Sequence, residues 1–245
     1  MKKNFLKTLG VLMMGIFLSN VYILKTGANT MNETDILTPR QQSIAHIAAL
    51  TAAGDMPKLN EALNKGLDTG LSVNEIKEVL VQMYAYAGFP RSLNGLGAFQ
   101  NVLKERQAHG ITDKTGDAGK ELPQGTDKFA YGNQVQIDLT GRPVTGGVMD
   151  FAPAIDSFLK EHLFADIFGR GVLSYQDREV ATIAALAAMT GVQSQLGSHI
   201  QIGMNTGLSD AQIAQIIAVV KEDVGVSRAA AATEVLNKIK KGKQK

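Results

Sequence analysis

The sequence predicts an all-α protein built from two tandem helical repeats related by a pseudo-twofold axis. The first observation is an internal repeat, because residues 37–71 match residues 173–208 with an offset of 136 that becomes 137 after one extra residue. The second is the helical spacing of apolar residues such as Val180, Ile183 and Ala187. The matched landmarks are the Ile-Ala-Ala-Leu segments at 47–50 and 183–186, Gly54 with Gly191, Leu59 with Leu196, Gly66 with Gly203, and the Thr-Gly-Leu-Ser segments at 69–72 and 206–209.

Helix-start signals occur at equivalent places in the two repeats. Thr38 and Ser72 each precede a Gln or Glu by three residues, which is the capping-box pattern, and Ser174 and Ser209 begin the same device or a weaker relative. Each repeat therefore reads as helix, short turn, helix, Gly-Leu-Ser turn and helix, without the alternation typical of strands. Gly88 and Pro90 end the third helix of the first repeat, and a further helix follows over 92–107, with its counterpart running from Gly225 to Lys240.

The first 28 residues are predicted to be a signal peptide. Three lysines precede an apolar run over 9–18, and Thr26-Gly27-Ala28 has the small-x-small pattern of a cleavage site. We therefore expect an exported protein, periplasmic or secreted, whose mature chain begins near Asn29 and has no membrane contact after processing. An uncleaved anchor is the alternative, although Ser19 and Asn20 interrupt the apolar run.

The remaining chain divides into a first repeat over 31–108, a linker over 109–150 and a second repeat over 151–241. The linker is rich in Gly, Asp, Lys and Thr, and the alternation of Val135, Ile137 and Leu139 predicts one short strand inside it. An amphipathic helix over 153–168 is expected to lead into the second repeat.

Composition excludes several classes of function. The formal net charge of +2 is too small to indicate nucleic acid binding, and the basic run at 238–245 is interpreted as a solvated tail. The absence of cysteine excludes disulfides, thiolate metal ligation and thiol chemistry. The four histidines lack the paired spacing of metal ligands, so we do not expect a metal site.

Glu179 and His199 are the residues that most strongly indicate chemistry. Both are expected on inward faces of successive helices, and the first repeat replaces them with Ser43 and Ala62. Because both are missing from the same half, we interpret them as a cooperating pair and the first repeat as degenerate. The structural alternative is a Glu179 paired with Arg178 or Arg170, and a hydrogen-bonded histidine in the core.

Several motifs resemble the carboxymuconolactone decarboxylase family, which shares a fold with alkylhydroperoxidase D. They are Leu-Ser-x-x-Asp-Arg-Glu at 173–179, Gln-Leu-x-x-His at 195–199 and Tyr-Ala-Gly-Phe-Pro at 86–90. The resemblance implies an all-helical domain that assembles in rings of three or six units. Here it would be a tandem fusion of two repeats, and we expect a homo-oligomer, specifically a trimer of two-repeat chains.

The peroxidase branch of that family uses a Cys-x-x-Cys pair, which would fall at Val192 and Gln195 in this sequence. What remains is a carboxylate and an imidazole, the equipment of the decarboxylase branch. The resemblance thus implies a cofactor-independent carboxy-lyase or lactone-processing enzyme acting on a small cyclic or unsaturated carboxylic acid. Glu179 and His199 would transfer protons, while Tyr86 and Arg91 would bind a substrate carboxylate or oxyanion. The alternatives are a non-catalytic binding or assembly protein and, disfavoured by the missing cysteines, a peroxidase.

Overall fold

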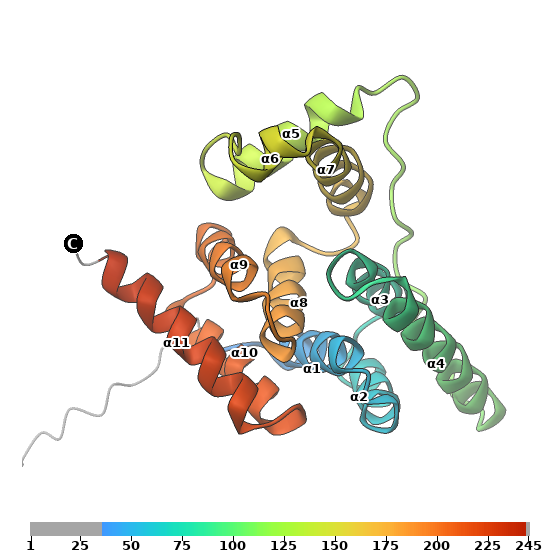
Figure 1. The fold of residues 1–245 in the computed structure, drawn as a ribbon. Coiled ribbons are helices and arrows are strands. Elements are labelled where there is room, and N and C mark those ends of the chain that lie inside the picture. Colours follow the sequence, from blue (N-terminus) through green and yellow to red (C-terminus); the bar gives the residue numbers. More distant parts are fainter. Residues whose placement is uncertain (1–35, 244–245) are drawn as a thin grey trace, which may run out of the picture. The chain divides into compact units, whose positions relative to one another are not determined.

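A computed structural model describes residues 36–243, and every regular element in that range is a helix (Figure 1). The predicted signal peptide lies outside the described residues. The first repeat contains α1 (Pro39–Ala53), α2 (Met56–Asp68), α3 (Val73–Ala87) and α4 (Phe89–Ala108). The second contains α8 (Tyr175–Ala188), α9 (Gln193–Asn205), α10 (Asp210–Asp223) and α11 (Val226–Lys243). Between them lie α5 (Lys128–Thr140), α6 (Val148–Phe151), α7 (Pro153–Ser157), the π-helix η2 (Phe158–Ile167) and the 3₁₀ turn η3 (Phe168–Arg170).

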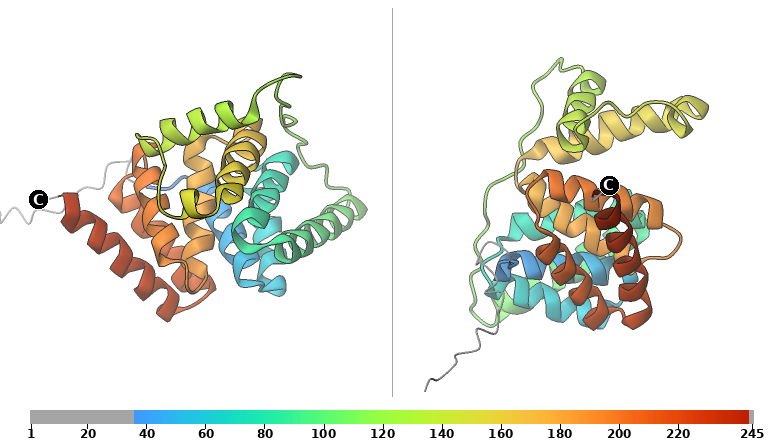
Figure 2. Two further views of the ribbon diagram at one scale, coloured as in Figure 1. Left: turned by 45° about the horizontal axis from the view of Figure 1, so that its top comes forward. Right: turned by 90° about the vertical axis from the view of Figure 1, so that its left-hand side faces the viewer.

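The two repeats have the same helix order and a reciprocal packing. Each helix of the second repeat starts 136 or 137 residues after its counterpart, which confirms the repeat predicted from the sequence. The most extensive helix pair is α1 with α8, one from each repeat, and α3 packs on α8 as α10 packs on α1. Figure 2 shows these helices from two further directions. Such exchanged contacts are the pattern that a pseudo-twofold axis between the repeats produces.

The predicted helix starts are present. Thr38, Ser72 and Ser209 form complete capping boxes, while the Ser174 hydroxyl accepts from the Asp177 amide without the reciprocal bond. Helix α1 ends at Gly54, whose φ of 79° is a left-handed conformation that favours glycine. Each cap satisfies backbone groups that the helix itself leaves unpaired, so the helix boundaries follow directly from these residues.

Alanines make the contact between α1 and α8 close. Ala48 and Ala49 on α1 and Ala184 and Ala185 on α8 are completely buried. Both helices are buried around most of their circumference, as expected for helices at the centre of a bundle. From Asp177 to Ala188 every side chain on α8 is buried, including the ionisable ones.

The segment between the repeats is a helical hairpin and not a linker with one strand. The predicted strand is wrong because Val135 and Leu139 lie four residues apart on the buried side of α5, and Asp127 and Gly141 cap that helix. The predicted amphipathic helix after the linker is present, but most of it is the π-helix η2. A Cβ on Gly132 would lie 1.7 Å from the carbonyl oxygen of Lys160, so only glycine permits α5 to approach η2 this closely.

This hairpin packs on α9 and on the end of α3. Its apolar residues form a separate cluster with Ile202 of α9, and Tyr84 and Tyr86 of α3 pack against that cluster. The Asn205 side chain donates to the carbonyl of Leu139 at 2.9 Å. The hairpin thus covers a face of the second repeat next to the predicted position of His199.

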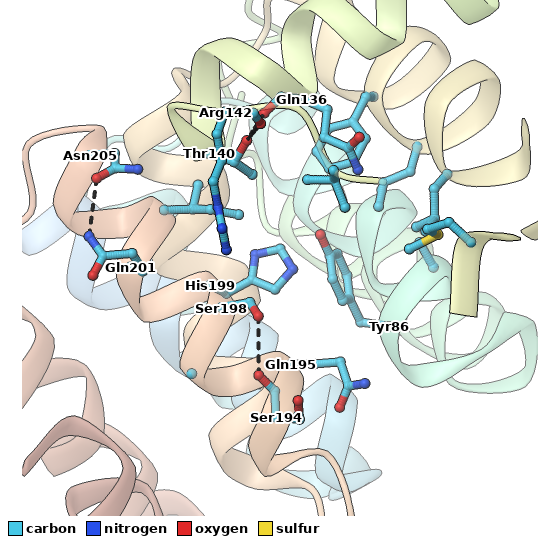
Figure 3. A pocket seen from close by; sticks show the side chains of 18 residues that line it. Tyr86, Gln136, Thr140, Arg142, Ser194, Gln195, Ser198, His199, Gln201 and Asn205 are labelled. Carbon is cyan, nitrogen blue, oxygen red and sulfur yellow. Dashed lines mark hydrogen bonds between the residues drawn. The ribbon is translucent and has the colours of Figure 1, made fainter. Parts of the chain in front are cut away.

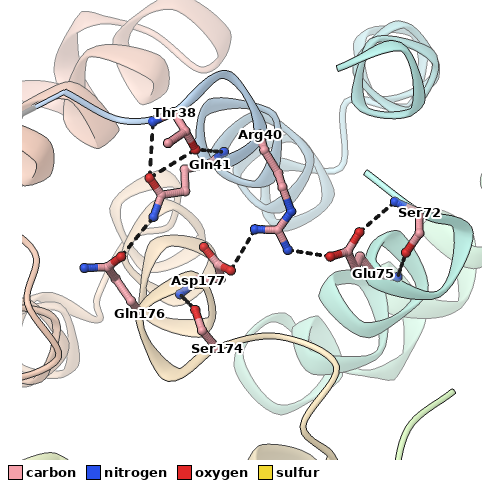
Figure 4. Close-up of polar contacts among 8 residues, drawn as sticks. All are labelled: Thr38, Arg40, Gln41, Ser72, Glu75, Ser174, Gln176 and Asp177. Carbon is pink, nitrogen blue, oxygen red and sulfur yellow. Dashed lines mark hydrogen bonds and ion pairs between the residues drawn. The ribbon is translucent and has the colours of Figure 1, made fainter. Parts of the chain in front are cut away.

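Arg40 joins three helices through two ion pairs (Figure 4). Its guanidinium lies 2.6 Å from Glu75 on α3 and 2.8 Å from Asp177 on α8. Gln41 donates to Gln176 at 3.1 Å beside them. The polar end of the contact between α1 and α8 is therefore held by side chains that cross between the repeats.

Replacing Arg40 with methionine is expected to lower the free energy of unfolding by about 1.5–3 kcal/mol, because two charged hydrogen bonds are lost and Asp177 is left largely buried without its partner. Urea unfolding monitored by circular dichroism measures this change. Lys240→Met is the matched control, since it removes an exposed ion pair to Asp210 and should change stability by less than about 0.5 kcal/mol. Equal effects of the two substitutions would contradict this role of Arg40.

The Glu75 contribution should depend on pH. Burial alone would raise the pKa of Glu75, but hydrogen bonds from the Ser72 amide and from Arg40 outweigh it and place the pKa below its ordinary value of 4.5. A carboxylate with a depressed folded-state pKa stabilises above the unfolded-state value, and loses this effect as pH falls through the folded-state value. The unfolding free energies of wild type and Glu75→Gln should therefore differ at pH 7, and the difference should shrink as pH falls below 4.5 and through the lower folded-state pKa. A difference that stayed constant between pH 7 and pH 3 would count against the pair.

Gly203 lets α9 approach α8, as Gly66 does for α2 and α1 in the first repeat. A Cβ on Gly203 would lie 2.9 Å from Ile183 and 3.1 Å from Leu208, both of which are buried. Gly203→Ala should therefore lower the free energy of unfolding by about 1–2 kcal/mol. Gly197→Ala on the same helix would meet only Val235 at 3.6 Å and should be neutral or stabilising by up to about 1 kcal/mol. The same urea titrations measure both, and a Gly203→Ala protein as stable as Gly197→Ala would refute the packing argument.

Candidate functional site

Glu179 and His199 contact each other. The imidazole Nδ1 lies 2.8 Å from the Glu179 Oε2 atom, and this contact joins α8 to α9. The Glu179 side chain is completely buried, whereas 12% of the His199 side chain is exposed. Gly203 follows His199 by one turn, so the close approach of the two helices at that glycine also brings the imidazole within reach of the carboxylate.

The contact uses Nδ1 of His199 and Oε2 of Glu179, and leaves the Nε2 and Oε1 atoms outside it. The Glu179 Oε1 atom is buried and has no hydrogen-bond partner among the described residues. An ionised carboxylate only accepts hydrogen bonds, so the Nδ1 atom of His199 carries the proton toward Glu179 and the Nε2 atom keeps a lone pair. One further proton converts the ring to imidazolium, whose Nε2–H is an acid. The pair can therefore take or give a proton at Nε2.

The expected structural alternative, a salt bridge from Glu179 to a neighbouring arginine, does not occur. Arg178 is buried and donates to Gln82 at 2.9 Å and to Glu78 at 3.2 Å. Arg170 pairs with the same Glu78 at 2.7 Å. Burial lowers the pKa of Arg178, with Glu78 as the main opposing influence. Both arginines are thus committed to Glu78, and among the described residues Glu179 has His199 as its hydrogen-bond partner.

His199 lines a cavity of about 760 Å³ (Figure 3), and Glu179, which does not line the cavity, is hydrogen-bonded to the His199 ring. One wall is the polar face of α9, which includes Ser194, Gln195 and Ser198. The opposite wall comes from the hairpin between the repeats and from the end of α3. Its apolar members are Val144, Met149, Leu159, Leu163 and Phe164. The volume is in the range of cavities that hold small organic ligands.

Tyr86 reaches this cavity from the first repeat. Its ring lies edge-on to the His199 imidazole with the centroids 5.3 Å apart. The hydroxyl is buried and has no hydrogen-bond partner among the described residues. Burial raises the pKa of Tyr86, the charge of Glu179 raises it further, and the nearby Thr182 hydroxyl opposes this only in part. The phenol therefore stays protonated and can donate a hydrogen bond to a ligand.

Arg91 does not belong to this cavity, contrary to the expectation that it would face the substrate. It lies in the first turn of α4, and its Nε atom is 3.9 Å from the point where a Cβ on Gly54 would stand. The proline before it starts α4 and turns the chain away from α9. The structure thus brings together Glu179, His199 and Tyr86 but leaves Arg91 outside.

Two lining residues were missed by sequence reasoning because they lie in the segment interpreted as a linker. Gln136 on α5 is buried, and its Oε1 atom has no partner among the described residues. Arg142 follows α5, and its guanidinium extends into the cavity toward His199 (Figure 3). The only available signal was the glycine that ends α5 directly before Arg142, which marks a helix end and not a site.

The equivalent place in the first repeat has different chemistry. Ser43 takes the position of Glu179, and its hydroxyl is paired with Thr69 at 2.8 Å and with the Pro39 carbonyl. In the same region His46 contacts Asp223 at 2.8 Å. His46 corresponds to Thr182 of the second repeat, and Asp223 on α10 corresponds to Tyr86 on α3. The pair of Glu179 and His199 therefore has one copy per chain.

Within residues 36–243, no cluster of three or more histidine or carboxylate side chains has the arrangement of a metal site. Over the same part of the chain, no helix combines the length and the apolar character that crossing a membrane requires.

Comparison with known families identifies the chain. The model of the carboxymuconolactone decarboxylase family matches residues 22–101 and again residues 153–238. A comparison with curated proteins finds no match. Because the two family matches together cover more than half of the chain and correspond to the two repeats, the protein belongs to the carboxymuconolactone decarboxylase family in a tandem, cysteine-free form.

Proposed function

We propose that the protein is a cofactor-independent lyase that processes a small cyclic or unsaturated carboxylic acid or lactone by proton transfer. The observation that supports this most strongly is the buried Glu179 carboxylate bonded to His199, whose second ring nitrogen is free at the wall of a cavity of about 760 Å³. A buried carboxylate is costly unless it is paired and hydrogen-bonded, and a buried carboxylate that orients an imidazole is a known arrangement in acid–base catalysis.

In a decarboxylation at this site, the bond between the carboxylate carbon and the neighbouring carbon breaks. The electron pair of that bond moves into an adjacent carbonyl or its vinylogue and forms an enolate, while CO₂ leaves. The Nε2–H of the His199 imidazolium then gives its proton to carbon, and solvent returns a proton to the pair. Glu179 holds the ring in place and stabilises its positive charge.

Tyr86 supports this chemistry because charge develops on an oxygen during the reaction. Its buried phenol remains protonated, since its pKa is raised, and has no protein acceptor within the described residues. A donor that is already in place and shielded from water stabilises an enolate oxygen more than it stabilises a neutral carbonyl. Tyr86 would thus contribute mainly in the transition state.

Peroxidase activity is disfavoured, because Val192 and Gln195 stand where thiol chemistry would need cysteines. The second candidate is a non-catalytic binding protein. It is favoured by the size of the cavity and by the first repeat, in which the equivalent pair has already been lost.

We also propose the export and the trimeric assembly of the protein. Support for assembly comes from Phe89 and Val226, which start α4 and α11 at equivalent places in the two repeats. Both are exposed apolar side chains, at 62% and 68%.

The proton-transfer proposal predicts that His199→Ala and Glu179→Gln each reduce turnover by about 10²–10⁴-fold. The first removes the acid, and the second removes the carboxylate that positions the acid and stabilises its positive charge. The double variant should be little worse than either single one, since members of one catalytic unit are not additive. The measurement is CO₂ release and ring-opening absorbance over a panel of small unsaturated carboxylic acids and carboxylated lactones.

His109→Ala is the control, because this histidine is exposed at the end of α4. Folding of all variants is checked by circular dichroism. If folded His199→Ala and Glu179→Gln proteins keep wild-type turnover, the pair is structural. If the wild-type protein binds members of the panel but converts none of them, the binding-protein alternative is preferred.

A further inference from the structure

The cavity contains one permanent charge. Of the residues that line it, only Tyr86, Arg142 and His199 are ionisable, and none is an aspartate or glutamate. Within the described range 36–243, Arg40, Arg106, Arg170 and Arg178 form ion pairs, whereas Arg91, Arg142 and Arg228 form none. Of these three unpaired arginines, Arg142 is the one that lines this cavity. The Glu179 carboxylate does not line the cavity and is hydrogen-bonded to His199, so Arg142 is the charged group that faces the interior and attracts anions to it.

The backbone around Arg142 is held in one conformation. Gly141 before it is left-handed with a φ of 74°, and Pro143 after it restricts Arg142 to an extended conformation. The Thr140 hydroxyl donates to the Arg142 carbonyl at 2.6 Å. The backbone thus fixes where the Arg142 side chain starts, and in Figure 3 its guanidinium extends toward His199. The side chain itself is exposed and makes no hydrogen bond within the described residues, so a ligand that binds it also has to order it.

The opposite character of the other walls indicates what the rest of the ligand is. Leu159, Leu163, Phe164 and Ile202 provide an apolar surface, while the Gln136 Oε1 and the Tyr86 hydroxyl are buried polar atoms that no described residue satisfies. A matching ligand has an apolar body, one anionic group at the mouth and a polar group deeper in the cavity. A planar guanidinium fork matches a carboxylate in two parallel hydrogen bonds.

We propose that Arg142 is the specificity residue of this site and binds a carboxylate on an apolar-bodied organic acid. This assignment rests on the proposed function only where it says which bond of the ligand reacts. Binding of a carboxylate by Arg142 does not depend on any reaction. A departing carboxylate loses its charge, so holding it on a guanidinium would stabilise the ground state more than the transition state. The carboxylate on Arg142 therefore stays on the ligand and anchors it. In a decarboxylation, the departing carboxylate is a second one, the polar group deeper in the cavity, and the atom that receives a proton lies near His199.

The test compares 1-naphthoate with its neutral analogue 1-naphthamide by isothermal titration calorimetry. Wild-type protein should bind naphthoate at least about 10-fold more tightly than naphthamide, since a charged hydrogen bond is worth about 1.5–3 kcal/mol and 1.4 kcal/mol is tenfold. Arg142→Met keeps the apolar length of the side chain and should weaken naphthoate binding about 10–100-fold, to the level of naphthamide. Naphthamide binding should not change. Arg142→Lys should recover part of the loss because it keeps the charge but not the fork.

Arg91→Met is the matched control, because this arginine lies outside the cavity, and it should leave both affinities unchanged. Equal affinity of wild-type protein for the two probes, no binding of naphthoate at millimolar concentration, or an unchanged naphthoate affinity in Arg142→Met would each overturn the proposal. His199→Ala separates the two hypotheses. If naphthoate binding in this variant still depends on Arg142, the carboxylate-binding role of Arg142 is supported, whether or not the protein is an enzyme. If turnover depends on His199 but not on Arg142, the proposed function is supported and the role of Arg142 is not.

Discussion

The close packing of α1 against α8 is the constraint on which the rest of the structure depends. Two alanine-rich helices from different repeats meet at the centre and are buried around most of their surface. Any ionisable residue placed on α8 must therefore find its partner inside the protein. Glu179 finds it in His199 because a glycine on α9 allows that helix to come close, and the same packing in the first repeat surrounds a serine with hydroxyl and carbonyl partners. One scaffold thus supports a carboxylate–imidazole pair in one half and a neutral hydrogen-bond group in the other.

The features predicted correctly from the sequence are those that depend on residues close together in the chain. The helix starts follow from Thr38, Ser72 and Ser209, whose side chains cap their own helices, and the inward positions of Glu179 and His199 follow from helical spacing. Tyr86 was also identified, although through a resemblance and not from spacing. Arg91, named on the same basis, lies elsewhere because the proline beside it starts a new helix. A motif indicates which residues are close in sequence, but the direction of each side chain depends on the turn between them.

The segment between the repeats shows where such reasoning fails. Val135, Ile137 and Leu139 alternate like a strand, yet the first and last of them are also four residues apart, as on one face of a helix. Polar composition around them suggested a linker, whereas the packing of Gly132 on the backbone of Lys160 holds the segment as an ordered hairpin. That contact joins residues far apart in sequence and has no periodic signature. Arg142 and Gln136 were missed for the same reason, since their importance comes from what the hairpin covers.

The hairpin also explains why the chain has a single site although its scaffold is doubled. A pseudo-twofold places equivalent backbone in both halves, so the difference between them has to come from side chains and from whatever lies outside the repeats. In this protein, the different side chains and the hairpin both modify the second repeat. The second repeat supplies Glu179 and His199, the end of α3 supplies Tyr86, and the hairpin adds an apolar wall and a positive charge. In the first repeat the residue matching Tyr86 is Asp223, which is already paired with His46. Duplication therefore provides the helical support in both halves, and the inserted hairpin makes the surroundings of the two halves chemically different.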